Sequence, residues 1–132
     1  MGCGSIVLAI RHPSMLVGIH SLLATEADAI LMAVDEVSLL GAIQKVTPDL
    51  VIADLSFPVS GGTNVMKLIK QCNPAIKMII LSTYDDPLVV DDIIKDGADG
   101  VVLRQRAVVD LIPAVREVCR GGRYVSVSSI EK

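Results

Sequence analysis

Asp49-Leu50-Val51-Ile52-Ala53-Asp54, residues 49–54, places four consecutive aliphatic residues between two acids. A run without polar residues is typical of a strand that is buried on both faces of a parallel sheet. The strand runs into Asp54, and Pro58 with Gly61-Gly62 predicts a loop soon after it. The chain therefore has a carboxylate directly at the end of a buried strand.

Similar aliphatic runs alternate with helix-period segments along the chain. Together with residues 50–53, strands are predicted at residues 6–10, 29–34, 76–81 and 101–103. Apolar residues spaced three or four apart predict helices that include residues 16–23, 40–46, 65–72, 89–94 and 108–120. Alternating units of this size predict the α/β class, with a doubly wound five-stranded parallel sheet and helices on both faces.

The composition argues against several classes of function. A net charge of −3 provides no basic surface for nucleic acid. No apolar run approaches the roughly 20 residues of a membrane-spanning helix, and the N-terminus lacks the features of a signal peptide. We therefore expect a cytoplasmic protein with no membrane partner.

The three cysteines are Cys3, Cys72 and Cys119, and none is part of a CxxC motif. Cys72 and Cys119 follow apolar residues at helical intervals. This pattern favours small buried hydrophobic residues in a reducing compartment over redox or metal chemistry.

The carboxyl ends of the predicted strands are where a ligand should bind, because open parallel sheets bind ligands beyond those ends. The residues found there are Ile10-Arg11-His12, Asp35-Glu36, Asp54, Ser82 and Arg104.

Read in order, these positions and their flanking segments resemble the response-regulator receiver family, and most closely its NarL/FixJ subfamily. The segments that carry the resemblance are His12-Pro13, residues 49–54, Ser82-Thr83-Tyr84-Asp85-Asp86, Gly97-Ala98-Asp99-Gly100 and Arg120-Gly121-Gly122-Arg123-Tyr124-Val125-Ser126. The resemblance covers about residues 5–126, which implies a receiver domain at residues 1–126 and the start of a linker or C-terminal tail at 127–132. It also implies a flavodoxin-like (βα)5 fold with strand order 2-1-3-4-5.

By this resemblance Asp54 is the phosphoacceptor, a carboxylate that attacks phosphorus to form an acyl phosphate. Ser82 and Arg104 are implied to contact the phosphate, and Mg²⁺ is the implied cofactor. The implied role is signal transduction rather than enzymatic. The implied partners are a sensor histidine kinase, a second copy in a homodimer, and DNA only through a helix-turn-helix output domain that is not in this chain.

The implied metal site is altered. The family has two acidic residues after its first strand, and this chain has Ile10 and Arg11 there. Only Asp54 and the backbone of Ser56 remain as ligands, which makes a poor site for an ion that prefers hard oxygen ligands. Arg11 could pair its permanent charge with Asp54 in place of the ion, or it could face solvent.

Other family features are changed as well. The lysine after the fifth strand is Arg104, and the aromatic switch position on that strand is Val101. Asp35 and Glu36 follow the second strand and are not expected to replace the missing acids. The acids Asp91, Asp92 and Asp96 are expected on the outer face of the fourth helix.

Three functions are compatible with these residues. The first is an atypical receiver with weak or absent Mg²⁺-dependent phosphorylation, which acts through dimerisation or an output domain. The second is a working receiver that is phosphorylated at Asp54 and controls transcription. The third is a flavodoxin-like enzyme or cofactor binder, which the absence of a glycine-rich loop after the first strand argues against.

Overall fold

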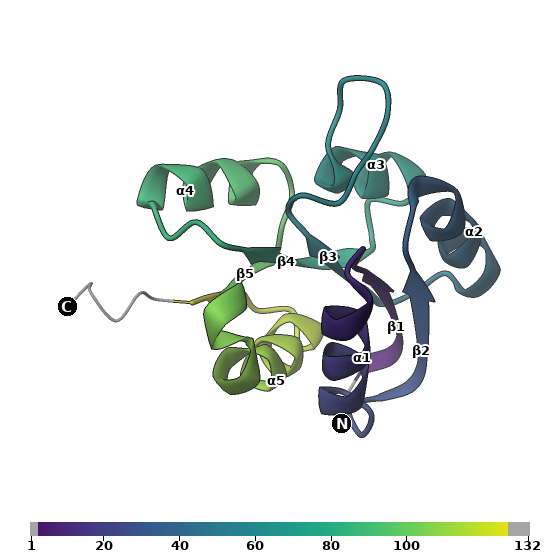
Figure 1. Ribbon diagram of the computed structural model, residues 1–132, viewed down its shortest axis with the longest axis horizontal. Coiled ribbons are helices and arrows are strands. Elements are labelled where there is room, and N and C mark those ends of the chain that lie inside the picture. Colours follow the sequence, from purple (N-terminus) through teal and green to yellow (C-terminus); the bar gives the residue numbers. More distant parts are fainter. Residues whose placement is uncertain (1–2, 127–132) are drawn as a thin grey trace.

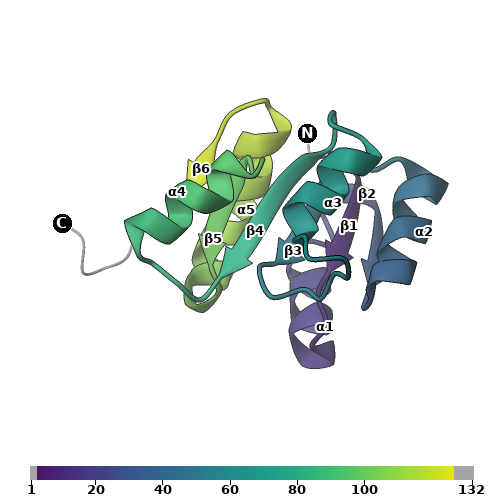
Figure 2. The ribbon, with the colours of Figure 1, turned by 90° about the horizontal axis from the view of Figure 1, so that it is seen from above.

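The computed structural model describes residues 3–126, and its centre is a parallel sheet in the strand order β2-β1-β3-β4-β5-β6. Figure 2 shows β2 at one edge of the sheet and β6 at the other. The strands are β1 (Cys3–Ala9), β2 (Ala27–Ala33), β3 (Leu50–Asp54), β4 (Lys77–Ser82), β5 (Gly100–Leu103) and β6 (Tyr124–Val125).

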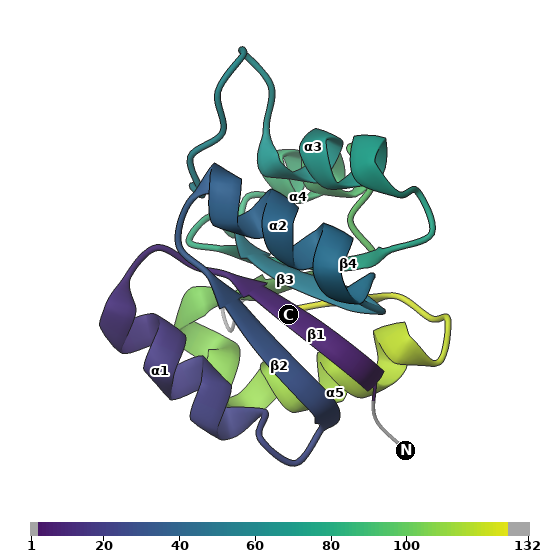
Figure 3. The same cartoon turned by 90° about the vertical axis from the view of Figure 1, so that its right-hand side faces the viewer.

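Five α-helices and one short 3₁₀ turn connect the strands. They are α1 (Pro13–Leu22), α2 (Glu36–Val46), α3 (Val65–Cys72), α4 (Pro87–Lys95), η1 (Arg104–Arg106) and α5 (Ala107–Cys119). Helices α2, α3 and α4 cover one face of the sheet and α1 and α5 cover the other (Figures 1 and 3). No helix within residues 3–126 is long and apolar enough to cross a membrane.

The sheet has an apolar core on each face. Val7, Val51 and Ile80 lie in the core beneath α2, α3 and α4, whereas Leu8, Ile52 and Leu81 lie in the core beneath α1 and α5. Successive residues of one strand thus enter opposite cores, because side chains alternate between the faces of a sheet. This explains why the central strands are continuously aliphatic rather than alternating with polar residues.

The predicted fold class and the order 2-1-3-4-5 are confirmed, and the sheet is longer by one strand. Tyr124–Val125 pairs with Gly100 and Val101 of β5 in the parallel direction. A strand of two residues leaves no readable pattern, so the sequence predicted only five. The first strand also begins earlier than the predicted residues 6–10, because Cys3 pairs with Ala27 of β2.

The cysteines differ from the prediction. Cys3 is buried as expected, but it forms a disulfide with Cys119, and the two Cα atoms are 5.8 Å apart. Cys72 is exposed rather than buried, because it occupies the last turn of α3. The disulfide contradicts the prediction against redox chemistry. That prediction was based on sequence spacing, which gives no signal for two cysteines that are 116 positions apart.

Candidate functional site

The predicted site residues of three neighbouring strands meet at the carboxyl edge of the sheet. Asp54 ends β3, Ser82 ends the adjacent β4, and Arg104 directly follows β5. A pocket of about 290 Å³ opens at this edge. Its lining residues are Asp54, Leu55, Ser56, Thr83, Tyr84 and Arg104.

Asp54 is 4% exposed, and its two carboxylate oxygens have different surroundings. The Oδ1 atom accepts hydrogen bonds from the backbone N–H of Ser56 at 3.0 Å and from its hydroxyl at 2.9 Å. The Oδ2 atom is buried and accepts no hydrogen bond from the described residues. A buried carboxylate oxygen without a partner is uncommon and indicates a position where a further group can bind.

Arg104 is the cation closest to that oxygen. Its Nη1 atom lies 3.9 Å from Asp54 Oδ2, which is an ion pair but too long for a hydrogen bond. Its Nη2 atom contacts the sulfur of Met15 on α1 at 3.0 Å, so the guanidinium lies between α1 and the pocket. Arg104 therefore compensates the charge of Asp54 from the side of α1.

The hydroxyl of Ser82 makes its hydrogen bonds with the turn that follows β4. It accepts from the backbone N–H of Tyr84 at 2.9 Å and donates to the carbonyl of Tyr84 at 3.1 Å. Ser82 is 1% exposed, whereas Tyr84 is 60% exposed at the mouth of the pocket. To donate to a group bound at Asp54, the hydroxyl would have to give up the bond that it donates to the Tyr84 carbonyl.

The two positions that replace the family's acids lie in different environments. Ile10 is fully buried in the core beneath α1 and α5. Arg11 is exposed, and no described carboxylate lies within ion-pair distance of it. Of the two alternatives for Arg11, the structure has the one in which it faces solvent, and Arg104 forms the pair with Asp54 instead.

Asp35 and Glu36 have structural contacts that keep them from the pocket. Asp35 caps α2 by accepting from the backbone N–H of Ser38 at 2.8 Å, and the side chain and the backbone N–H of Ser38 lower the pKa of Asp35. Glu36 accepts from the N–H and the hydroxyl of Ser60 at 2.8 and 2.9 Å, which fastens the loop between β3 and α3. They do not replace the missing acids.

The remaining predicted positions are Val101, which lies in the core, and the three acids at α4. Val101 is 1% exposed and lies in the core beneath α2, α3 and α4. An aromatic switch residue would also need an exposed position, and Val101 has none. Asp91 and Asp92 are exposed on α4 as predicted. Asp96 is half-buried and accepts from the amide of Asn64 at 2.9 Å, so it joins α4 to the start of α3.

Magnesium, the implied cofactor, does not fit these residues well. Asp54 is the only carboxylate that lines the pocket, and a guanidinium lies beside it. Among residues 3–126, no group of three or more His, Cys, Asp or Glu side chains could hold a metal ion. A site with one carboxylate and an adjacent cation is unfavourable for a divalent ion that requires several oxygen ligands.

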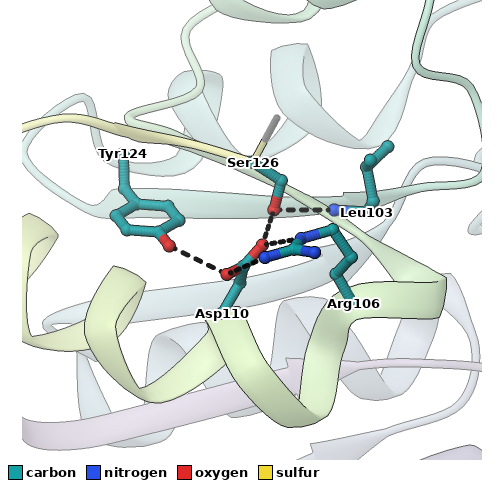
Figure 4. Close-up of polar contacts among 5 residues, drawn as sticks. All are labelled: Leu103, Arg106, Asp110, Tyr124 and Ser126. Atoms are coloured by element: carbon teal, nitrogen blue, oxygen red, sulfur yellow. Dashed lines mark hydrogen bonds and ion pairs between the residues drawn. The ribbon is translucent and has the colours of Figure 1, made fainter. Parts of the chain in front are cut away.

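A second polar group, which the sequence analysis missed, lies close to the pocket. We call Arg106, Asp110, Tyr124 and Ser126 the Asp110 cluster (Figure 4). Asp110 is 4% exposed and accepts from Arg106 Nε at 2.8 Å, Tyr124 Oη at 3.0 Å and Ser126 Oγ at 2.6 Å. The Ser126 hydroxyl also accepts from the backbone N–H of Leu103 at 3.2 Å.

The Asp110 cluster attaches the end of the described chain to α5. Burial opposes the charge of Asp110, but the bonds from Arg106, Ser126 and Tyr124 hold its pKa below the ordinary value. The spacing of Arg106 and Asp110, four residues apart on a helix, was the one signal in the sequence that could have revealed the pair. The contributions of Tyr124 and Ser126 depend on β6, which was not predicted.

Comparisons with known proteins agree with this arrangement. The sequence model of the family described as response regulator receiver domain matches residues 6–116. The transcriptional regulatory protein DegU of Brevibacillus brevis is 30% identical over 122 residues, which are 91% of this chain and 52% of DegU. The oxygen regulatory protein NreC of Staphylococcus carnosus is 32% identical over 123 residues, which are 91% of this chain and 57% of NreC.

The chain therefore spans about half the length of the curated relatives that it matches. A similar solved structure is the non-phosphorylated receiver domain of the stress response regulator RcsB from Escherichia coli. It has a TM-score of 0.84 at 24% identity, and the match covers 93% of this chain and 98% of that one. At this level of identity the likeness shows the fold.

Proposed function

This chain belongs to the response regulator receiver family, and from that premise we propose that it is an atypical receiver in which Mg²⁺-dependent phosphorylation is weak or absent. Its curated relatives are NarL/FixJ-type regulators. Asp54 has the phosphoacceptor position in this proposal, with Ser82 and Arg104 as the groups that contact a bound anion. Val101 is the altered switch position.

One observation carries the proposal: among the described residues Asp54 is the only carboxylate that lines the pocket, and Arg104 Nη1 lies 3.9 Å from its Oδ2 atom. Receiver domains of this family typically use Mg²⁺. The ion neutralises charge as phosphoryl transfer proceeds. The side chains of the buried Ile10 and the exposed Arg11 offer no oxygen ligand for it. Arg104 supplies a positive charge next to Asp54, but without the exchangeable coordination positions of a metal ion.

Incubation with acetyl phosphate and Mg²⁺, followed by mass spectrometry of the intact protein, tests this. We expect no adduct with the mass of one phosphoryl group. An adduct that is formed by the unchanged protein and is lost in Asp54→Asn would refute the proposal. A typical receiver with both acids, treated in parallel, controls for the phosphodonor.

The second candidate is a working phosphoacceptor that a sensor histidine kinase phosphorylates. Asp54 Oδ2 favours it, because this oxygen has no hydrogen-bond partner among residues 3–126 and its residue lines an open pocket. If the missing acids limit the reaction, Arg11→Asp combined with Ile10→Asp should increase labelling. Since Ile10 is buried, Arg11→Asp should also be tested alone, so that a folding defect is not mistaken for a lack of chemistry.

We further propose that the signal passes through a homodimer that uses the surface between α1 and α5. An apolar pocket of about 480 Å³ lies there, and Val108 at its rim is 82% exposed. Exposed apolar surface of this kind is typical of protein interfaces. The main lining residues are Met15, Gly18, Ile19, Leu22, Ala107 and Val108.

Light scattering coupled to size-exclusion chromatography tests the dimer. Val108→Glu should shift the protein towards monomer. Val37→Glu on α2 is the matched control, because Val37 is 80% exposed on the opposite face of the sheet. If both variants have the mass of the unchanged protein, a dimer through this surface is ruled out.

In a longer regulator, DNA binding would come from an attached output domain. DegU is named a transcriptional regulatory protein, and this chain matches 52% of it. The net charge of −3 agrees with a receiver that does not itself contact DNA.

A further inference from the structure

The disulfide lies at the edge of the sheet opposite Asp54, where the first strand meets the last turn of α5. Cys3 is the first residue of β1 and Cys119 is the last residue of α5. Their Cα separation of 5.8 Å is within the ordinary range for a disulfide. We propose that Cys3 and Cys119 form a reversible thiol–disulfide site that low-molecular-weight disulfides oxidise.

A separate set of contacts brings the two cysteines together. The backbone N–H of Cys3 donates to the carbonyl of Glu26 at 3.1 Å. The carboxylate of Glu26, which is 7% exposed, accepts two hydrogen bonds of 3.1 Å from the guanidinium of Arg116. Arg116 lies three residues before Cys119, nearly one helical turn away, so this ion pair is a second link between the end of α5 and the start of β1, separate from the disulfide.

A small reagent can reach the site. Both cysteines line a pocket of about 470 Å³, with Asp49 and Lys77 among its other lining residues. Cys119 is half-buried, whereas Cys3 is 6% exposed. Cys119 is therefore the sulfur that an external disulfide meets first, and Cys3 is positioned to resolve the intermediate.

The reaction has two balanced steps. The Cys119 thiolate attacks oxidised glutathione, which forms a mixed disulfide and releases one glutathione thiolate. The Cys3 thiolate then attacks the Cys119 sulfur, which forms the protein disulfide and releases the second glutathione thiolate. Two electrons pass from the protein sulfurs to the glutathione disulfide, and the two protons pass to the released thiolates.

Counting free thiols in the full chain tests the proposal. Reduced protein is treated with oxidised glutathione, denatured in acid and alkylated. Because the chain has three cysteines and Cys72 lies outside the pair, we expect one alkylated thiol after oxidation and three without it. A proteolytic fragment in which Cys3 is linked to Cys119 should appear only after oxidation.

Variants and stability separate this site from general thiol reactivity. Cys72→Ser should change the counts to none and two, whereas Cys119→Ser should leave Cys3 unable to form an intramolecular bond. The bond closes a loop across 116 positions, so oxidation should raise the melting temperature by on the order of 10 °C in the unchanged protein and in Cys72→Ser. Three free thiols after oxidation, stable glutathione adducts without a Cys3–Cys119 link, or disulfides only between chains would each overturn the proposal.

Discussion

Asp110→Asn should destabilise the domain strongly at neutral pH. The substitution keeps the size of the side chain but removes its charge and replaces one acceptor oxygen by a donor. The carboxylate now accepts from Arg106, Tyr124 and Ser126 at distances between 2.6 and 3.3 Å. The amide cannot accept all of these bonds, and it leaves the cation of Arg106 without its counter-charge.

The magnitude follows from the burial of each group. Hydrogen bonds to a charged group contribute about 1.5–3 kcal/mol each, and breaking a buried ion pair costs about 3–5 kcal/mol. Arg106 and Tyr124 are only half-buried and can regain water, whereas Ser126 is buried. We therefore expect a loss of about 3 kcal/mol in the free energy of unfolding, which for this chain length lowers the melting temperature by about 10 °C.

The effect should depend on pH in a defined direction. The folded-state pKa of Asp110 lies below the ordinary value of 3.8, so its contribution is fully present above that value and is lost as the pH falls through the folded-state pKa. The difference between the unchanged protein and Asp110→Asn should therefore be largest near pH 7 and should narrow below pH 3.8.

Urea unfolding followed by circular dichroism, in reductant and at several pH values, measures this difference. Asp91→Asn on the exposed side of α4 is the control and should change stability by less than about 0.5 kcal/mol. If Asp110→Asn matches that control, or if its deficit is constant down to acid pH, the assigned role of the Asp110 carboxylate is wrong.

Three further substitutions, two of them each with a comparison variant, test other parts of the structure by the same unfolding assay. Gly97→Ala should lower the free energy of unfolding by more than about 1 kcal/mol, because the φ of Gly97 is +118° and a Cβ atom would lie 2.9 Å from the side chain of Lys70 on α3. Gly18→Ala on α1, with open space around it, should instead raise the free energy of unfolding by about 0.5–1 kcal/mol. Ile10→Asp should cost about 3 kcal/mol or more at neutral pH, because it places a carboxylate in a fully buried apolar position, and part of the loss should be regained in acid as the carboxyl protonates. Glu26→Gln should lower the free energy of unfolding by about 1 kcal/mol above pH 4.5, because Arg116 lowers the pKa of Glu26; the stabilisation by this ion pair is lost as the pH falls through the folded-state pKa. Glu117→Gln, in a more exposed ion pair, should have a smaller effect.

The sheet was predictable because its central strands are short, aliphatic and separated by clear helical segments. Residues 50–53 and 78–81 are buried, and a continuous run of buried aliphatic residues is typical of a strand in a parallel sheet that is covered on both faces. The sixth strand was not predictable, because the two residues Tyr124–Val125 are held by β5 and by the Asp110 cluster rather than by any pattern of their own.

The sequence predicted that Asp54 and Arg104 follow neighbouring strand ends, but it did not predict the contacts that they make. Strand ends bring Asp54 and Arg104 together at one edge of the sheet, as parallel topology requires. Which arginine pairs with Asp54 depends on the path of the chain after β1, where Arg11 faces solvent. The pairing of Cys3 with Cys119 likewise depends on where α5 ends relative to β1, and linear spacing holds no information about that.

The turn η1 connects two charged sites. Arg104 at its start reaches Asp54, and Arg106 at its end binds Asp110. The two arginines are two residues apart on one 3₁₀ turn, so the two ion pairs share the same short stretch of backbone. The charge of Asp54 and the last described strand, β6, are therefore connected through one segment of three residues.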